Sequence, residues 1–132
     1  ERPDVIIIEG QGALSHPAYS TSSFILRGSC PDAVVLQHAP GRTQRCDFAA
    51  MAMPTPAREI NLIETFADTK VIGLTINHEN MTDTEIDAAI VRYEGELGIP
   101  VTDALTRSPA DLVAMVRAAF PGFGGMPTAD AA

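Results

Sequence analysis

The stretch KVIGLTINHENMTDTEIDAAIVRYEGELGIPV, residues 70–101, decides the fold class. An apolar run at 71–76 predicts a strand, and the apolar residues beyond the next loop have helical spacing: Ile86, Ala89, Ile90, Tyr93 and Leu97. Thr82 and Glu85 have the spacing of a capping box that starts this helix, and Gly98 is placed to end it. The run 99–101 then predicts a short edge strand. A strand, a helix and a second strand in this order are typical of a parallel sheet.

The same alternation extends toward the amino terminus. The continuous apolar run 4–9 predicts a central strand that is covered on both faces. A short helix over 20–26 is expected to end at Gly28, and the run 33–36 predicts another strand. A long connection with two prolines then leads to a helix over 57–68.

A last helix is expected to start at Ser108 and Pro109, because proline favours the first helical position. Its inward residues are expected to be Leu112, Val113, Val116 and Phe120. Together these elements predict an α/β domain over residues 1–120, with a parallel sheet between flanking helices in three α/β/α layers. The Pro-, Gly- and Ala-rich residues 121–132 are expected to form a flexible tail.

Composition limits the function classes. The chain has 132 residues, of which 45% are hydrophobic, so it can bury one core but hardly two. Its net charge of −8 and scattered Lys and Arg argue against a nucleic-acid surface. No apolar run approaches the ~20 residues that span a bilayer and no signal peptide opens the chain, so we expect a cytoplasmic protein without membrane contact. Cys30 and Cys46 have no metal-binding spacing and are expected to be free thiols.

Polar or Gly-rich segments follow all four predicted strands. The carboxyl ends of parallel strands meet at one edge of the sheet, where open α/β sheets bind their ligands. The segments expected at this edge are 9–12, 38–42, 77–79 and Asp103. Their convergence around a Gly-rich turn predicts a site for a small molecule, with Glu9, His16, His38 and Arg42 lining one pocket.

Each candidate residue has a functional and a structural interpretation. Glu9 can hold Mg²⁺ or polarise a nucleophile, or it can cap the next turn. His16 can act as a base, a metal ligand or a phosphate contact, or it can bond to the backbone as a loop histidine, and His38 is similar. Arg42 can contact a phosphate or carboxylate at two points, or remain a solvated loop cation. Asn77 can recognise a purine edge or cap its own loop.

Three segments resemble a known family: EGQGALSHPAYS at 9–20, GSCPDAVVLQHAPGR at 28–42 and KVIGLTINHENM at 70–81. They resemble the carboxyl-terminal P-loop domain of the D-glutamate N-acetyltransferase family, formerly a bacterial family of unknown function and related to dethiobiotin synthetase-like P-loop proteins. The resemblance covers about residues 4–116 and implies the second half of a P-loop NTPase-like domain. It also implies acetyl transfer from acetyl-CoA to the amine of D-glutamate.

The resemblance extends to individual residues. Glu9 matches a Walker-B-like acid and His16 lies in the site loop, which makes these two the catalytic candidates. Substrate or phosphate binding is implied for Gly10, Gln11, Gly12, Tyr19, His38, Arg42 and Asn77. No metal ligand is assigned; a transition-metal site built from Glu9, His38, His78 and Glu79 is a minority alternative without helical HxxxH spacing.

The sequence contains no GxxxxGK[ST] loop to cradle phosphates. We therefore expect the chain to be a fragment that is inactive alone. The resemblance implies that its partners are a Walker A segment and an amino-terminal Rossmann-like domain of the same protein. A homo-oligomer is also expected.

The leading function is an N-acetyltransferase for a small amino acid, with acetyl-CoA as co-substrate and His16 or Glu9 as the base that deprotonates the amine. The alternatives are an ATP- and Mg²⁺-dependent ligase or kinase of the dethiobiotin synthetase type and a non-catalytic nucleotide-binding module.

Overall fold

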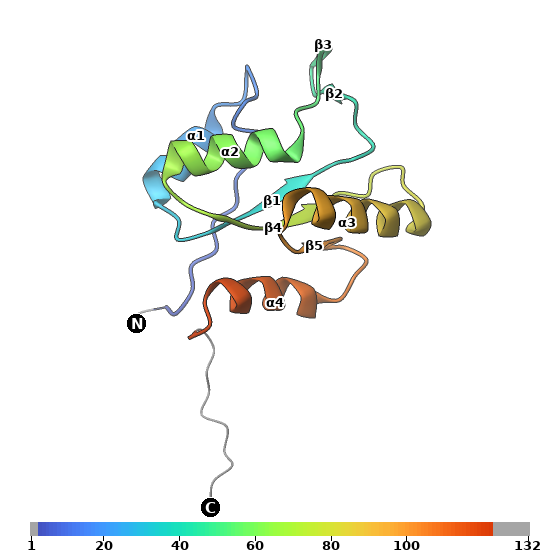
Figure 1. Ribbon diagram of the computed structural model, residues 1–132. Helices are drawn as coiled ribbons and strands as arrows, with labels where there is room; N and C mark the ends of the chain where they lie inside the picture. The colour runs from blue at the N-terminus through green and yellow to red at the C-terminus, as the bar shows by residue number, and fades with distance from the viewer. Residues whose placement is uncertain (1–2, 123–132) are drawn as a thin grey trace, which may run out of the picture. The chain divides into compact units, whose positions relative to one another are not determined.

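The computed structural model, drawn in Figure 1, describes residues 3–122. Its contacts divide the chain into two compact units. The first unit contains the residues up to Leu36 together with Arg42–Val71. The second contains Gln37–Gly41 and the residues from Ile72 onward. Apart from its first two residues, the predicted tail 121–132 lies outside the described residues.

The first unit contains two helices and a hairpin. Helix α1 spans Thr21–Ser29 and helix α2 spans Pro56–Ala67. Thr55 caps α2 by accepting a hydrogen bond from the Arg58 amide. The two helices lie side by side, with the Arg27 guanidinium 5.0 Å from the centroid of the Phe66 ring (Figure 1).

Strands β2 (Gln44–Arg45) and β3 (Phe48–Ala52) form the hairpin. They pair antiparallel, and Asp47 in the turn has a φ of 60°. The hairpin was not predicted, because its residues alternate poorly between apolar and polar types.

Two predictions for the first unit are wrong. Residues 4–9 form no strand, and Ile7 is 90% exposed. A strand that is covered on both faces needs hydrogen-bonded neighbours, and within the described residues neither sheet includes this segment. Helix α1 runs through Gly28 and ends at Ser29, and Cys30 after it takes the left-handed conformation expected of the glycine.

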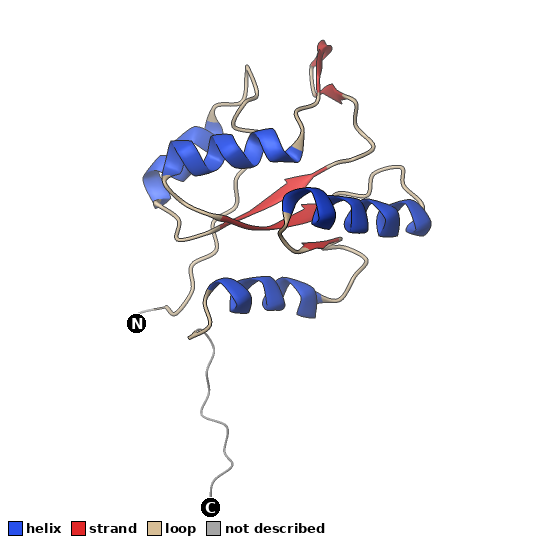
Figure 2. Ribbon diagram, in the orientation of Figure 1, coloured by secondary structure: helices blue, strands red, loops and turns tan. Residues whose placement is uncertain are grey.

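The second unit holds most of the three-stranded sheet, whose order is β1-β4-β5 (Figure 2). Strand β1 spans Val34–His38, two residues longer at its carboxyl end than predicted, β4 spans Val71–Ile76, and β5 spans Val101–Thr102. Strands β4 and β5 are parallel, with Leu74 opposite Val101. The prediction of an α/β fold with a parallel sheet and helices is therefore confirmed.

Helix α3 spans Asp83–Leu97 and follows its sequence signals closely. Both hydrogen bonds of the capping box between Thr82 and Glu85 are present, and Gly98 ends the helix with a φ of 66°. Of the predicted stripe, Ile86, Ala89 and Tyr93 are buried and the others are half-buried.

Helix α4 spans Pro109–Ala119 and is capped by Ser108, as predicted. Its inward face was predicted only in part, because Leu112 and Val116 are half-buried on it but Val113 and Phe120 are exposed. Met115 is 2% exposed, whereas Val113 is 48% exposed and Phe120 is 37% exposed. Leu112, Met115 and Val116 follow the i, i+3, i+4 spacing of one helical face, and the predicted set left out its central residue. No helix within residues 3–122 has the length and apolar character needed to cross a membrane.

Candidate active site

Two of the predicted strand ends meet in the second unit. The Asn77 amide, just after β4, donates a 2.7 Å hydrogen bond to the carbonyl oxygen of His38 at the end of β1. The expectation that the carboxyl ends of parallel strands meet at one edge of the sheet therefore predicted correctly that His38 and Asn77 lie close together. The Asn77 side chain caps its own loop by accepting from the Glu79 amide at 3.2 Å, which is the structural interpretation of this residue.

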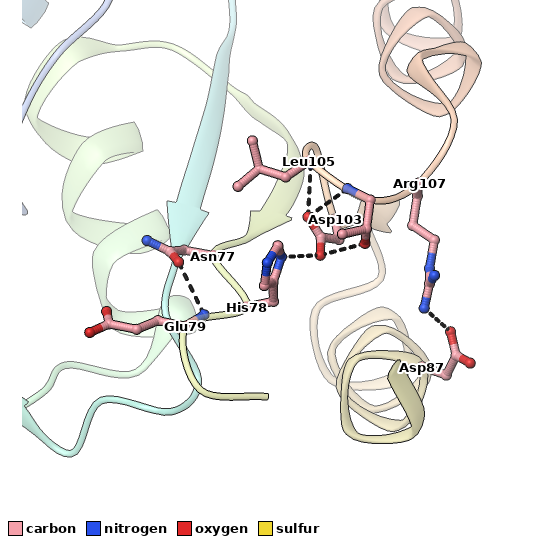
Figure 3. Close-up of polar contacts among 8 residues, drawn as sticks. Asn77, His78, Glu79, Asp87, Asp103, Leu105 and Arg107 are labelled. Carbon is pink, nitrogen blue, oxygen red and sulfur yellow. Dashed lines mark hydrogen bonds and ion pairs between the residues drawn. The ribbon is translucent and has the colours of Figure 1, made fainter. Parts of the chain in front are cut away.

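A histidine and an aspartate form a close pair at the same strand ends (Figure 3). His78 follows β4, Asp103 follows β5, and His78 Nδ1 lies 2.5 Å from Oδ2 of Asp103. The Asp103 side chain is fully buried, whereas 31% of the His78 side chain is exposed. The sequence placed both residues near the sheet edge but did not predict the pair.

Further hydrogen bonds hold Asp103 in place. The Leu105 amide donates to Oδ1 at 2.8 Å, and the Thr106 hydroxyl donates to Oδ2 at 2.8 Å. Burial alone would raise the pKa of Asp103, but the hydrogen bonds from Leu105, Thr106 and His78 together lower it. Asp103 is therefore an ionised carboxylate that only accepts hydrogen bonds.

The ionised carboxylate determines the tautomer of His78. Because Asp103 can only accept, Nδ1 of His78 carries the hydrogen that it donates. In the neutral ring, Nε2 is then left as a proton acceptor. This arrangement can take up a proton on one side of the ring while the carboxylate stabilises the resulting cation on the other.

His38 lies in a different environment. Its ring meets the Tyr93 ring edge-on, with centroids 5.6 Å apart. Burial, and then the positive charge of Arg92, lower the pKa of His38. The Arg92 guanidinium itself lies over the Tyr93 ring, 4.3 Å from its centroid. These contacts keep the His38 ring neutral.

A pocket of about 370 Å³ lies beside these loops in the second unit. It is lined by Pro40, Gly41, Asn80, Met81, Glu85, Ala88, Ala89 and Arg92. Gly41 allows the loops after β1 and β4 to approach closely, since a Cβ atom at this position would lie 2.7 Å from the Glu79 carbonyl oxygen. The Gly of the segment HAPGR is therefore needed for close approach of the backbone.

His16, in the first unit, uses both ring nitrogens. Its Nε2 donates to the Cys46 carbonyl oxygen at 3.0 Å, and its Nδ1 accepts from the Ala18 amide at 3.2 Å. The ring also stacks on Tyr19, with centroids 4.3 Å apart. This is the geometry of a loop histidine bonded to backbone, and the predicted role of His16 as a base stays a prediction.

Tyr19 donates a short hydrogen bond to Asp47 in the hairpin turn. This bond, and then the charge of Asp47, raise the pKa of Tyr19 to about 12. The preceding turn is tied to α1, because the Ser22 hydroxyl donates to the carbonyl oxygens of Gln11 and Gly12. Gly12 has a φ of 80°, and a Cβ atom at this position would lie 2.9 Å from Cβ of Tyr19. A Cβ atom at Gly10 would lie 3.7 Å from Cδ1 of Ile25.

Glu9 is exposed, and like His16 and Arg42 it belongs to the first unit, whereas His38 belongs to the second. Convergence of these four residues on one pocket stays a prediction. Among the residues that the structure describes, no three His, Cys, Asp or Glu side chains gather as a metal site would require.

The chain matches known proteins over most of its length. Residues 1–113 match the P-loop domain of DUF1611, described as a domain of unknown function (DUF1611_C). A D-glutamate N-acetyltransferase of Pseudoalteromonas sp. is 33% identical over 114 residues, which are 82% of this chain and 34% of that protein. A second, from Tritonibacter scottomollicae, is 30% identical over 113 residues, 81% of this chain and 34% of that protein.

A solved structure agrees with these matches. The crystal structure of a DUF1611 family protein from Anabaena variabilis is 29% identical, with a TM-score of 0.78 over 83% of this chain and 34% of that one. The chain thus spans about a third of the length of the proteins it matches. The resemblance drawn from its three motif segments is confirmed, and the chain belongs to the DUF1611 family, whose carboxyl-terminal P-loop domain it matches.

Proposed function

We propose that the full-length protein transfers an acetyl group from acetyl-CoA to the amine of D-glutamate or a similar small amino acid. The observation that carries this proposal is the 33% identity, over 82% of this chain, to a relative that is named a D-glutamate N-acetyltransferase. The matched part is 34% of that relative, so the test requires the full-length protein.

The chemistry requires a base and groups that hold the anionic parts of both substrates. A base must remove a proton from the substrate ammonium, because only the free amine can attack a thioester. Cationic and amide groups must hold the phosphates of CoA and the carboxylates of the amino acid, and Arg42 and the turn Gly10–Gly12 are the candidates in this chain. Glu9 and His16 are the predicted bases, although the ring nitrogens of His16 are both engaged with backbone.

Purified full-length protein provides the test. It is incubated with acetyl-CoA and D-glutamate, the released CoA thiol is followed, and the N-acetylated product is identified by mass spectrometry. L-glutamate and reactions without amino acid serve as controls. Release of CoA that depends on D-glutamate supports the proposal.

The same mixture with ATP and Mg²⁺ in place of acetyl-CoA tests the alternative. Formation of ADP that depends on the amino acid would instead support a ligase or kinase, consistent with the P-loop domain match. Release of neither CoA nor ADP, with binding still detectable by calorimetry, would indicate a nucleotide-binding module.

A further inference from the structure

We propose that His78 is the base of this reaction, accepting a proton from the substrate ammonium at Nε2, and that Asp103 positions its ring. The inference rests on the proposed acetyl transfer and adds the residue that moves the proton. Figure 3 shows the two side chains pointing toward one another from the loops that follow β4 and β5.

The geometry of the pair fits this role on both sides of the ring. Asp103 is 0% exposed and receives hydrogen bonds from the Leu105 amide and the Thr106 hydroxyl, so its carboxylate cannot swing away from the ring. Nδ1 of His78 is fixed on this carboxylate at 2.5 Å. With 31% of its side chain exposed, His78 remains accessible to a ligand. A buried carboxylate that orients a partly exposed imidazole is the arrangement that general bases use.

The chain contains three histidines, all within the described residues, and the other two are less suited. His16 donates from one nitrogen and accepts at the other, so a proton could be taken up only after the Ala18 amide is released. Burial and Arg92 lower the pKa of His38, which opposes the cation that a base must become. Among these rings only His78 has a carboxylate partner for the imidazolium.

The proposed step balances as follows. The substrate ammonium gives one proton to Nε2 of His78, and the amine lone pair then forms a bond to the thioester carbonyl carbon. The carbon–sulfur bond breaks, the thiolate leaves, and the imidazolium returns its proton to the sulfur. The nitrogen loses its second proton to water. The net products are the N-acetylated amino acid, the CoA thiol and one proton.

The substrate class follows from this chemistry. Nε2 takes a proton from a positively charged donor, and the ionised Asp103 compensates the positive charge that arrives on the ring. The site therefore suits a small substrate with a primary ammonium group.

The test uses full-length protein and four variants. His78→Ala removes the ring, while His78→Asn keeps a donor to Asp103 but lacks Nε2. Asp103→Asn keeps the shape of the carboxyl group and loses its charge. Asp87→Asn is the matched control, because Asp87 pairs with Arg107 at 2.7 Å on the same unit, away from the pair (Figure 3).

Both His78 variants and Asp103→Asn are expected to lower kcat by about 10²–10⁴-fold with little change in the KM for the amino acid, since a positioned base contributes this much. Added imidazole should restore part of the kcat of His78→Ala, which a merely structural role would not allow. Asp87→Asn should keep the wild-type kcat. Nitrogen NMR of the folded wild type should show hydrogen on Nδ1 of His78, and Asp103→Asn should shift the ring toward the other tautomer.

The failures of the two proposals are distinguishable. Wild-type protein that releases no CoA refutes the acetyl transfer and the base assignment with it. Active wild type with an equally active His78→Asn refutes the base assignment alone. A wild-type ring that carries its hydrogen on Nε2 overturns the geometry on which the inference stands, whether or not His78→Ala folds.

Discussion

Substituting Gly73 by alanine should destabilise the second unit through one side chain of α4. Gly73 is buried in the middle of β4, and a Cβ atom built there would lie 2.5 Å from Sδ and 3.2 Å from Cγ of Met115. Ordinary contacts of this kind are 3.4–4 Å, so the sulfur would have to move by roughly 1 Å. Met115 is only 2% exposed, which leaves its side chain little free space to move into.

The expected cost follows from this crowding. Adding one methyl group to a well-packed core costs about 1–3 kcal/mol, because side chains leave their preferred rotamers or the backbone shifts. A flexible thioether relieves part of the strain, so we expect a loss in the lower half of that range. The assay is the free energy of unfolding in urea, together with hydrogen exchange of the β4 amides.

A double-mutant cycle identifies the cause. Met115→Ala alone should cost about 2–5 kcal/mol by leaving a cavity, and the Gly73→Ala methyl should then be tolerated because its obstacle is gone. The coupling energy between the two substitutions should therefore be favourable. Additive effects would show that the methyl group added at Gly73 does not clash with Met115. A Gly73→Ala substitution with no effect on the free energy of unfolding would refute the steric argument entirely.

Further predictions concern the loops and the helix cap, each measured by urea unfolding. Gly41→Ala should cost about 1–3 kcal/mol, because its Cβ would lie 2.7 Å from a backbone oxygen of Glu79 that cannot rotate away. Thr82→Ala should cost about 0.5–2 kcal/mol by removing the cap of α3, whereas Thr82→Ser should be close to neutral. Burial lowers the pKa of His38 in the folded protein, so on acidification the histidine of the unfolded chain takes up a proton at a higher pH than that of the folded chain. The free energy of unfolding should therefore fall as the pH drops below 6.5 and level off below the folded-state pKa. His38→Phe should remove that pH dependence; an unchanged slope would contradict it.

The parts of the fold that could be predicted are those with local causes. The capping box at Thr82, the glycine end of α3 and the proline start of α4 each depend on residues within one turn of the helix end. The bounds of β4 follow equally from an apolar run between polar residues. The inward face of α4 depends on what lies opposite, and the sequence alone did not show that Gly73 leaves room for Met115.

Segment 4–9 is a second case in which the structure depends on neighbours that the local sequence does not reveal. Its apolar residues indicate what the segment would bury, but a strand forms only when neighbouring strands supply hydrogen bonds. Within residues 3–122 both sheets exclude it, and Ile6 and Ile7 are largely exposed. The apolar run therefore predicted a strand that this segment does not form.

The candidate site, too, could be predicted only in part. The strand-end rule identified which loops meet, because the direction of parallel strands fixes their carboxyl ends. It did not determine where neighbouring side chains point: Asn77 turns back to the Glu79 amide, whereas His78 reaches Asp103 (Figure 3). Backbone topology can be inferred from sequence periodicity, but side-chain orientation in a loop depends on rotamers that no periodicity encodes.

The two loop histidines show why this orientation matters for function. His16 lies in the loop before α1 and His78 in the loop after β4, and of the two the sequence predicted only His16 as a base. A ring that accepts an amide hydrogen at one nitrogen and donates from the other, as His16 does, is a neutral cross-link that loses a hydrogen bond when it takes up a proton. A ring that donates to a buried carboxylate, as His78 does, strengthens its existing contact when it becomes charged. Taking up a proton therefore costs His16 a hydrogen bond, whereas it strengthens the hydrogen bond between His78 and its carboxylate partner. This difference is the physical reason for assigning the proton transfer to His78.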